Sequence, residues 1–418
     1  METATIQTAL PVASTSRRGW TVALSGLGIN LALGVLYTWS IFKPEIKKDF
    51  GWSDAQLNDP YALCCVVFAL AMIVAGRCQD KLGPRLTASI GGLLVGAGLV
   101  LISQSNSYAV WLMGFGVLAG IGIGFGYSSA TPPALKWFPP AKTGLIAGLV
   151  VAGFGVAPVY LSRTTKYLLA HYHVQNSMLI LGVAFLLVVC CLAQMLINPP
   201  AGFVPSGAGA ASAAKPAVAS ASPTEILRQP QFWLLWLIYF IGAGAGLMVI
   251  GSINGMATKR LGADLAFLAV AATAVGNASG RIGAGFLSDK IGRRWTLMLV
   301  LAFQAVLMFV AIPVTGSAGA KAAVLLVATL MGLNYGANLS LFPSLTKDLW
   351  GLKNFGLNYG VLFTAWGAGS LLSLVSQRML AASKSYDSSF EAAGGLLILG
   401  TLLTFGIKAK SGAEAQVR

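Results

Sequence analysis

A series of apolar runs, each long enough to cross a lipid bilayer, constrains this chain more than any other feature. A membrane-spanning helix needs about 20 consecutive apolar residues. Because backbone in lipid has to satisfy its own hydrogen bonds, each run is expected to form a helix. The twelve runs lie near residues 20–42, 59–79, 86–104, 108–130, 143–163, 176–197, 231–254, 265–287, 295–314, 321–343, 356–378 and 389–407.

Composition excludes the soluble classes of protein. Only 10% of the 418 residues are charged and 56% are hydrophobic, whereas soluble domains carry about 25% charged residues. Intrinsic disorder is excluded by the same apolar fraction. The sequence therefore predicts an all-α membrane protein with 12 transmembrane helices.

A segment rich in Pro, Ala, Gly and Ser divides the chain. It runs from Asn198 to Ser222 and has the composition of a flexible linker. We therefore predict an N-terminal six-helix bundle over residues 1–197, a linker over 198–229, and a C-terminal six-helix bundle over 230–418.

The basic residues orient the helices. The chain has 28 Lys and Arg against 13 Asp and Glu, and most of them fall on one side of the membrane if both termini lie on that side. Cytoplasmic loops are enriched in Lys and Arg, so both termini are expected in the cytoplasm, with the protein in the cytoplasmic (inner) membrane. This bias explains the net charge of +15 without a nucleic-acid partner.

An internal repeat supports two related halves. The loop Gly76-x-x-x-Asp80-Lys81-x-Gly83-x-Arg85 recurs half a chain later as Gly285-x-x-x-Asp289-Lys290-x-Gly292-x-Arg294. Further echoes pair Gly144, Gly148 and Gly155 with Gly356, Gly360 and Gly367, and Gly126 and Pro133 with Gly336 and Pro343. Two bundles with a pathway between them are the design of many secondary transporters.

The repeated loop has the chemistry of a latch. An Asp at a helix end can pair with a loop cation and with the N-terminus of a neighbouring helix, and glycines permit tight turns and close helix approach. A purely topogenic basic loop explains the positive charge, but it does not explain the recurring Asp or the matched glycines. The latch residues we predict are Gly76, Asp80, Lys81, Arg85, Gly285, Asp289, Lys290 and Arg294.

Arg281 is the one cation that no loop contains. It lies eight residues before Asp289, about 12 Å further along the eighth helix. A buried Arg costs at least about 2.5–3.5 kcal/mol, and every Asp and Glu falls in a tail, a loop or a helix end. The alternatives are a structural ion pair or snorkelling to the interface. We favour a substrate anion as its partner, with Asn277 one helical turn away on the same face.

These motifs resemble those of known transporter families. The repeated loop and the 6+6 arrangement resemble the major facilitator superfamily over nearly the whole chain. The eighth helix resembles that of the monocarboxylate transporters and oxalate/formate exchangers, in which this Arg binds the substrate carboxylate. Further matches are Gly34-Val-Leu-Tyr37-Thr-Trp39, Tyr127 with Trp137-Phe138-Pro139, Leu341-Phe342-Pro343-Ser344 and Asn358-Tyr359-Gly360.

Two departures from that group bear on mechanism. The mammalian monocarboxylate transporters carry an Asp, used in proton coupling, where this chain has Asn277. The oxalate exchanger carries a Lys where this chain has Trp366. One Arg without that Lys balances one carboxylate, so the resemblance implies a monocarboxylate substrate.

The resemblance also implies the residues that surround the substrate. Aromatic rings and hydroxyls would shape the pocket; helix packing is the alternative explanation for each of them. Beside Arg281 and Asn277, the substrate-binding candidates are Tyr37, Tyr127, Phe154, Tyr335, Trp366, Leu145, Leu339 and Phe363. The candidate proton carriers are the helix-end carboxylates Asp59, Asp264 and Glu391.

Taken together, these features predict a transporter and not an enzyme. We expect symport of a small monocarboxylate, with L-lactate as the best single choice, and protons by alternating access of a monomer, with no cofactor and no metal. A proton-independent carboxylate exchanger remains the alternative. An intramembrane enzyme needs clustered catalytic groups at depth, which the spans lack, and a channel does not account for the two-half repeat.

Overall fold

The computed structural model describes residues 12–200, 202–205, 220–250, 263–316, 321–383 and 385–407. Within these residues the secondary structure is helical throughout, as predicted. Among the described residues, ten helices are long and apolar enough to cross a membrane. One of them, Pro140–Ala193, contains the fifth and sixth predicted runs, because α7 (Thr143–Ala193) is two helices joined at His173. The eighth run lies on the 29-residue α12 (Ala263–Ile291), which is not among the ten. The arrangement is consistent with twelve spans.

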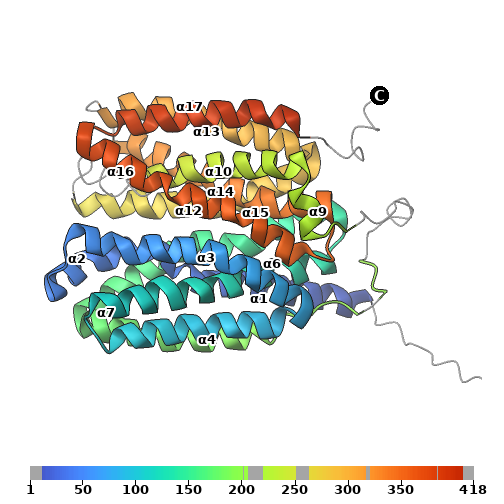
Figure 1. The fold of residues 1–418 in the computed structure, drawn as a ribbon, viewed down its shortest axis with the longest axis horizontal. Coiled ribbons are helices and arrows are strands. Elements are labelled where there is room, and N and C mark those ends of the chain that lie inside the picture. Colours follow the sequence, from blue (N-terminus) through green and yellow to red (C-terminus); the bar gives the residue numbers. More distant parts are fainter. Residues whose placement is uncertain are drawn as a thin grey trace, which may run out of the picture.

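The helices pack as two bundles that lie side by side (Figure 1). The first contains α1 (Val12–Leu33), η1 (Gly34–Thr38), α2 (Trp39–Phe50), α3 (Asp54–Leu82), α4 (Pro84–Ser103), α5 (Tyr108–Trp111), η2 (Leu112–Ala119), α6 (Gly120–Trp137), η3 (Pro140–Lys142) and α7. The short α9 (Pro223–Leu227) follows. The second bundle contains α10 (Pro230–Ile250), α12, α13 (Arg293–Gly316), α14 (Lys321–Trp350), α15 (Phe355–Ser370), α16 (Leu372–Ser383), α17 (Asp387–Leu403) and η4 (Thr404–Gly406). Across the boundary, α3 packs on α15 and α7 packs on α12.

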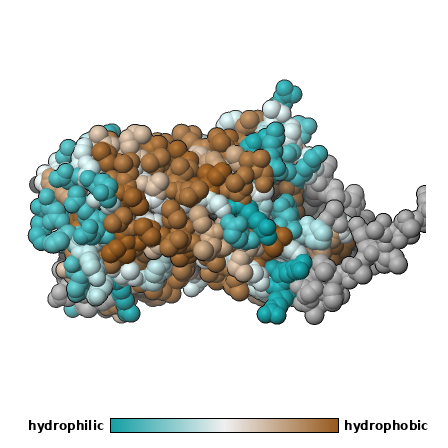
Figure 2. Space-filling model, turned by 90° about the horizontal axis from the view of Figure 1, so that it is seen from below, coloured by the Kyte–Doolittle hydropathy of each residue, from teal (hydrophilic) through white to brown (hydrophobic). Residues whose placement is uncertain are grey.

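Apolar side chains cover the middle of the molecular surface. Figure 2 shows a broad hydrophobic zone between two hydrophilic ends. Large apolar residues on this exterior are well exposed, including Leu70 at 56%, Val74 at 58% and Leu326 at 59%. In water such a patch would be unstable, so the surface fits the multi-pass membrane protein that the sequence predicts.

Two glycines make the turns between α3 and α4 and between α12 and α13. Gly83 has φ +89° and Gly292 has φ +90°, a left-handed region that favours glycine. Both glycines occupy the same position in the two copies of the repeated loop, so both copies turn in the same way. Asp80 contacts the start of α15 and Asp289 contacts the start of α7. The end of the molecule with these turns, where α9 packs on α15 (Figure 1), is here called the linker end.

Both ends of the predicted linker are docked on the bundles. At its start, Lys136 donates to the side chain of Asn198 at 3.1 Å, and the Trp137 indole donates to the carbonyl of the preceding Ile197 at 2.7 Å. At its end, the Trp350 indole donates to Gln229 at 2.9 Å, and the Ala221 carbonyl accepts from the side chain of Asn354 at 3.1 Å. The two Trp residues end α6 and α14, which occupy matching places in the two halves. The linker therefore braces both halves at the linker end.

Candidate functional site

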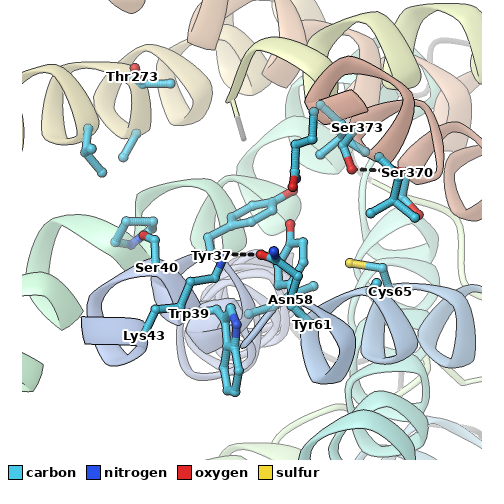
Figure 3. Close-up of a pocket in the computed structure, with 18 of the residues that line it drawn as sticks. Tyr37, Trp39, Ser40, Lys43, Asn58, Tyr61, Cys65, Thr273, Ser370 and Ser373 are labelled. Atoms are coloured by element: carbon cyan, nitrogen blue, oxygen red, sulfur yellow. Dashed lines mark hydrogen bonds between the residues drawn. The ribbon is translucent and has the colours of Figure 1, made fainter. Parts of the chain in front are cut away.

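A cavity of about 150 Å³ lies between the two bundles, away from the linker end. The first bundle contributes residues of η1, α2, α3 and α7, and the second contributes residues of α10, α12, α15 and α16. Figure 3 shows α2 and α3 on one side, with Thr273 of α12 and Ser370 and Ser373 on the other. Transporters built of two repeats bind their substrates at the interface between the repeats.

The cavity lining is polar at several points and carries one charged side chain. Lys43 of α2 donates to Asn58 of α3 at 2.5 Å (Figure 3). Tyr37, Ser40 and Asn277 also line the cavity. Among the described lining residues there is no Asp and no Glu. Lys43 is thus the charged residue among the described residues of the lining.

Arg281 lies at the boundary of the bundles and is completely buried. Its Nε donates to Asn277 Oδ1 at 2.8 Å, and its Nη1 donates across the boundary to the carbonyl of Val151 on α7 at 2.6 Å. Its Nη2 is buried with no hydrogen-bond partner. α7 approaches closely here, since a Cβ on Gly148 would lie 2.1 Å from the Arg281 carbonyl oxygen.

The Arg281 charge has no carboxylate partner in the part of the chain that the structure describes. The ion pairs found there join Lys48 to Glu45, and Arg293 to Asp289 and Asp348. A buried cation with one unused donor is costly unless an anion completes the site. Asn277 connects the two features, because it lines the cavity and also holds Arg281.

An aromatic cluster fills the boundary beside Arg281. Its rings come from both bundles, and their centroids lie 5.0–6.2 Å apart in the contacts that join them. All are buried except Tyr37, which is partly exposed in the cavity. The aromatic cluster consists of Tyr37, Phe68, Tyr127, Phe154, Phe363 and Trp366.

Tyr335 links the two bundles through its hydroxyl. It shares a 2.9 Å hydrogen bond with the Tyr37 hydroxyl and accepts a 2.9 Å hydrogen bond from the Trp366 indole. Tyr37 is placed for this contact by η1, a short 3-10 segment between α1 and α2. These two hydrogen bonds connect Tyr37, which lines the cavity, through Tyr335 to Trp366 of the aromatic cluster.

We expect Tyr335→Phe to destabilise the protein more than Tyr37→Phe. The first change leaves the buried Trp366 N–H without an acceptor, which costs about 1–3 kcal/mol. The second change leaves that bond in place and removes only the bond between the bundles. Thermal unfolding of the purified variants in one detergent measures the difference. Equal midpoints would contradict the assigned role of the Tyr335 hydroxyl.

The two repeated Asp residues make equivalent contacts at the linker end, each across the boundary of the bundles. Asp80 accepts from the backbone N–H groups of Gly356 and Leu357 at 3.0 and 2.9 Å. Asp289 accepts from those of Gly144 and Leu145 at 2.8 and 2.9 Å. Each carboxylate thus sits at a helix N-terminus of the other bundle, where the helix dipole favours negative charge.

Glycines that repeat in the two halves let the bundles come into close contact beside Asp80 and beside Asp289. A Cβ on Gly76 would lie 2.1 Å from the Gly356 carbonyl oxygen, and one on Gly144 would lie 2.2 Å from that of Gly285. Real side chains cannot approach so closely, so each contact requires glycine on both helices. The repeated loop of each half therefore packs against the repeated glycines of the other half, Gly76 on Gly356 and Gly285 on Gly144.

Arg293 belongs to this end of the molecule, although the repeat does not identify it. It pairs with Asp289 at 2.7 Å and with Asp348 at 3.0 Å. The other copy of the loop has Pro84 at this position, so a comparison of the two copies does not identify Arg293.

The four cations predicted for the latch lie elsewhere. Lys81, Arg85 and Lys290 are exposed, and Arg294 donates to the Phe405 carbonyl at 3.1 Å. The structure does not bring these four to the Asp residues.

The remaining predicted residues lie apart from the cavity. Leu145 is at the linker end, where its N–H binds Asp289, and Leu339 is buried in α14. Asp59 is exposed and accepts from Tyr108 at 2.5 Å, and Glu391 is exposed at the start of α17. The side chain of Asp264 lies outside the described residues. Tyr239 and Phe68 were not predicted, because an aromatic residue in an apolar helix carries no signal of its own.

Comparisons with known proteins agree with this architecture. The sequence matches the family described as the Major Facilitator Superfamily over residues 20–373 and 244–416. It is 27% identical to the oxalate:formate antiporter of Oxalobacter formigenes, over 89% of this chain and 87% of that one. It is 25% identical to monocarboxylate transporter 11 of Mus musculus, over 93% and 87% of the two chains. The fold matches the Escherichia coli fucose:proton symporter with a TM-score of 0.69 at 14% identity, over 93% and 98% of the two chains.

Proposed function

The chain belongs to the Major Facilitator Superfamily, and we propose that it carries a small monocarboxylate across the cytoplasmic membrane by alternating access of its two bundles. The observation that supports this most is the buried Arg281, which has an unused donor and no carboxylate partner among the described residues. A guanidinium binds a carboxylate through two parallel hydrogen bonds. The printed names of the oxalate:formate antiporter and of monocarboxylate transporter 11 share the broader class of small carboxylate anions, and the second name is that of a monocarboxylate carrier.

Charge and shape limit what the site would accept. One Arg balances one carboxylate, and the rings of the aromatic cluster offer apolar surface to a short carbon chain. Asn277 would orient the guanidinium, because it already holds Arg281 Nε. We propose L-lactate as the substrate to test first, with Tyr37, Tyr127, Phe154, Tyr335, Phe363 and Trp366 around its carbon end.

The two ends of the molecule would act as alternating gates. We propose that the linker end faces the cytoplasm, with both termini on that side. The Asp80 and Asp289 contacts then hold the cytoplasmic side closed while the cavity serves the outer side. Separation of the bundles at those contacts would release the substrate inward.

Coupling to protons is the proposal, and exchange of carboxylates is the second candidate. The described lining of the cavity contains no Asp or Glu that could carry a proton, and a relative is named an antiporter. Both observations favour exchange. Symport is favoured by the resemblance of the eighth helix to that of the monocarboxylate transporters.

Uptake of radiolabelled L-lactate into proteoliposomes tests both. Symport predicts saturable uptake that an inward proton gradient accelerates and a protonophore abolishes. Exchange predicts uptake that needs lactate or another carboxylate inside and persists without a gradient. If liposomes with purified protein take up no more lactate than protein-free liposomes under any of these conditions, lactate is not the substrate.

Trp366→Lys is expected to broaden selectivity toward dicarboxylates. A second cation beside the Arg281 site would balance a second carboxylate, while loss of the Trp366–Tyr335 bond would weaken lactate binding by about tenfold. Trp366→Phe is the control, because it removes the same bond without adding charge. Inhibition of labelled lactate uptake by oxalate or succinate measures the effect. Equal inhibition of the Lys and Phe variants would contradict it.

A further inference from the structure

We propose that Phe68 of α3 sets the upper limit on the length of the carbon chain that the transporter accepts. This inference rests on the proposed function, since it concerns the apolar end of the acid that Arg281 would bind. Phe68 is not part of the cavity lining and forms no polar contact, yet it contacts rings of both bundles.

Phe68 occupies the centre of the aromatic cluster. Its ring centroid lies 5.5 Å from that of Tyr127 and 6.2 Å from that of Phe154, both in the first bundle. It lies 5.0 Å from that of Phe363 and 5.3 Å from that of Trp366, both in the second. The side chain is 1% exposed. Any molecule placed between these four rings therefore meets Phe68.

The backbone holds Phe68 in place from two sides. On α15, a Cβ at Gly367 would lie 2.3 Å from Ala69 Cβ, and one at Gly360 would lie 2.3 Å from the Met72 carbonyl oxygen. On α6, a Cβ at Gly124 would lie 3.0 Å from the Phe68 carbonyl oxygen. Because close helix contacts flank it, the ring cannot move aside by a shift of α3 alone.

The path from the cavity to Phe68 passes through two rings. Tyr37 lines the cavity and packs edge-on against Phe154 at 5.0 Å, and Phe154 stacks on Phe68. Cys65, one turn before Phe68 on α3, still lines the cavity. Phe68 therefore lies just beyond the cavity lining, one helical turn after Cys65 in the direction of the linker end.

Arg281 anchors the other end of the substrate within reach of these rings. It binds the Val151 carbonyl, one turn before Phe154 on α7, at 2.6 Å. A carboxylate on Arg281 would direct its carbon chain into the aromatic cluster. The chain length that fits is then set by the ring that blocks the cluster at its centre, which is Phe68.

The experiment measures binding of 2-hydroxy acids of three to six carbons, lactate to 2-hydroxyhexanoate, to the purified full-length protein. A single methylene in an apolar pocket changes affinity by about 10- to 200-fold. We expect the wild type to bind lactate at least tenfold more tightly than the six-carbon acid. Phe68→Ala should reduce or reverse this ratio by tenfold or more, and Phe68→Leu should give an intermediate ratio.

Phe115→Ala is the matched control, since Phe115 is also 1% exposed but packs on Trp39 within the first bundle. It should leave the ratio unchanged. An unchanged ratio in Phe68→Ala and Phe68→Leu, with lactate still bound, would overturn the role of Phe68 alone. Binding of none of these acids by the wild type would overturn the proposed substrate class, and this inference with it. If the Ala variant fails to fold, the Leu variant decides.

Discussion

Arg281→Ala is expected to abolish transport of the carried acid. Loss of one partner of a buried, hydrogen-bonded charge pair costs about 2–5 kcal/mol, which corresponds to a loss of about 30-fold to several thousand-fold in affinity. Arg281→Lys keeps the charge but loses the planar fork that matches a carboxylate. It should therefore retain little activity. Uptake of labelled lactate by reconstituted variants measures both effects.

A stability measurement separates this role from a structural one. In the described structure Arg281 is buried with an unused donor and no carboxylate partner. Replacing a buried charge by an apolar side chain of similar volume is often neutral or stabilising. The ligand-free Arg281→Met variant should thus unfold at the same temperature as the wild type or higher, while lactate no longer raises that temperature. A large fall in the ligand-free midpoint would make Arg281 a structural residue.

Asn277→Ala is expected to reduce transport less than Arg281→Ala does. It removes the acceptor of Arg281 Nε and a polar group of the cavity wall but keeps the charge. We expect a loss of transport about tenfold or more, smaller than for Arg281→Ala, because one hydrogen bond to a charged group contributes about 1.5–3 kcal/mol. The apparent KM for lactate measures it. A loss equal to that of Arg281→Ala would mean that the guanidinium cannot act without Asn277.

The sequence predicts the helices and the depth of Arg281 well, because both follow from local properties. Long apolar runs specify spans, and a cation far from any loop stands out in such a chain. The Asp and Gly repeats also locate the linker-end contacts. Their pairing, in which Gly76 meets Gly356 and Asp289 caps α7, is a property of helix packing between distant segments and has no local signal.

The candidate site is less predictable than the fold for the same reason. Phe68 differs from another buried Phe of the first bundle, such as Phe115, only in what surrounds it. Arg293 differs from the other loop cations only in the carboxylates, Asp289 and Asp348, that its turn brings near. Comparison of the two repeat copies predicts Lys81, Arg85, Lys290 and Arg294 as partners of the Asp residues, and it misses Arg293. Residues that contact the other bundle are therefore missed wherever the two copies of the repeat differ.

The second large effect is expected from Asp80→Asn combined with Asp289→Asn, which should shift the protein away from the state described here. Each carboxylate accepts two backbone hydrogen bonds across the boundary, and a hydrogen bond to a charged group is worth about 1.5–3 kcal/mol. Weakening both contacts favours separation of the bundles at the linker end. The cavity at the other end should then close in most molecules, so that transport falls steeply.

Accessibility of the cavity reports this shift directly. Ser373 lines the cavity and is partly exposed, so Ser373→Cys in a cysteine-free background gives a single reactive site. We expect an impermeant thiol reagent, applied from the cavity side, to label the double Asn variant about tenfold more slowly than its parent, because a shift of 1.4 kcal/mol changes the equilibrium tenfold. Asp387→Asn is the control, since Asp387 lies at the start of α17, which packs mainly on α13 and α10. Equal labelling of all three proteins would mean that the Asp contacts do not hold the linker end closed, and the matched glycines alone would have to account for the closure.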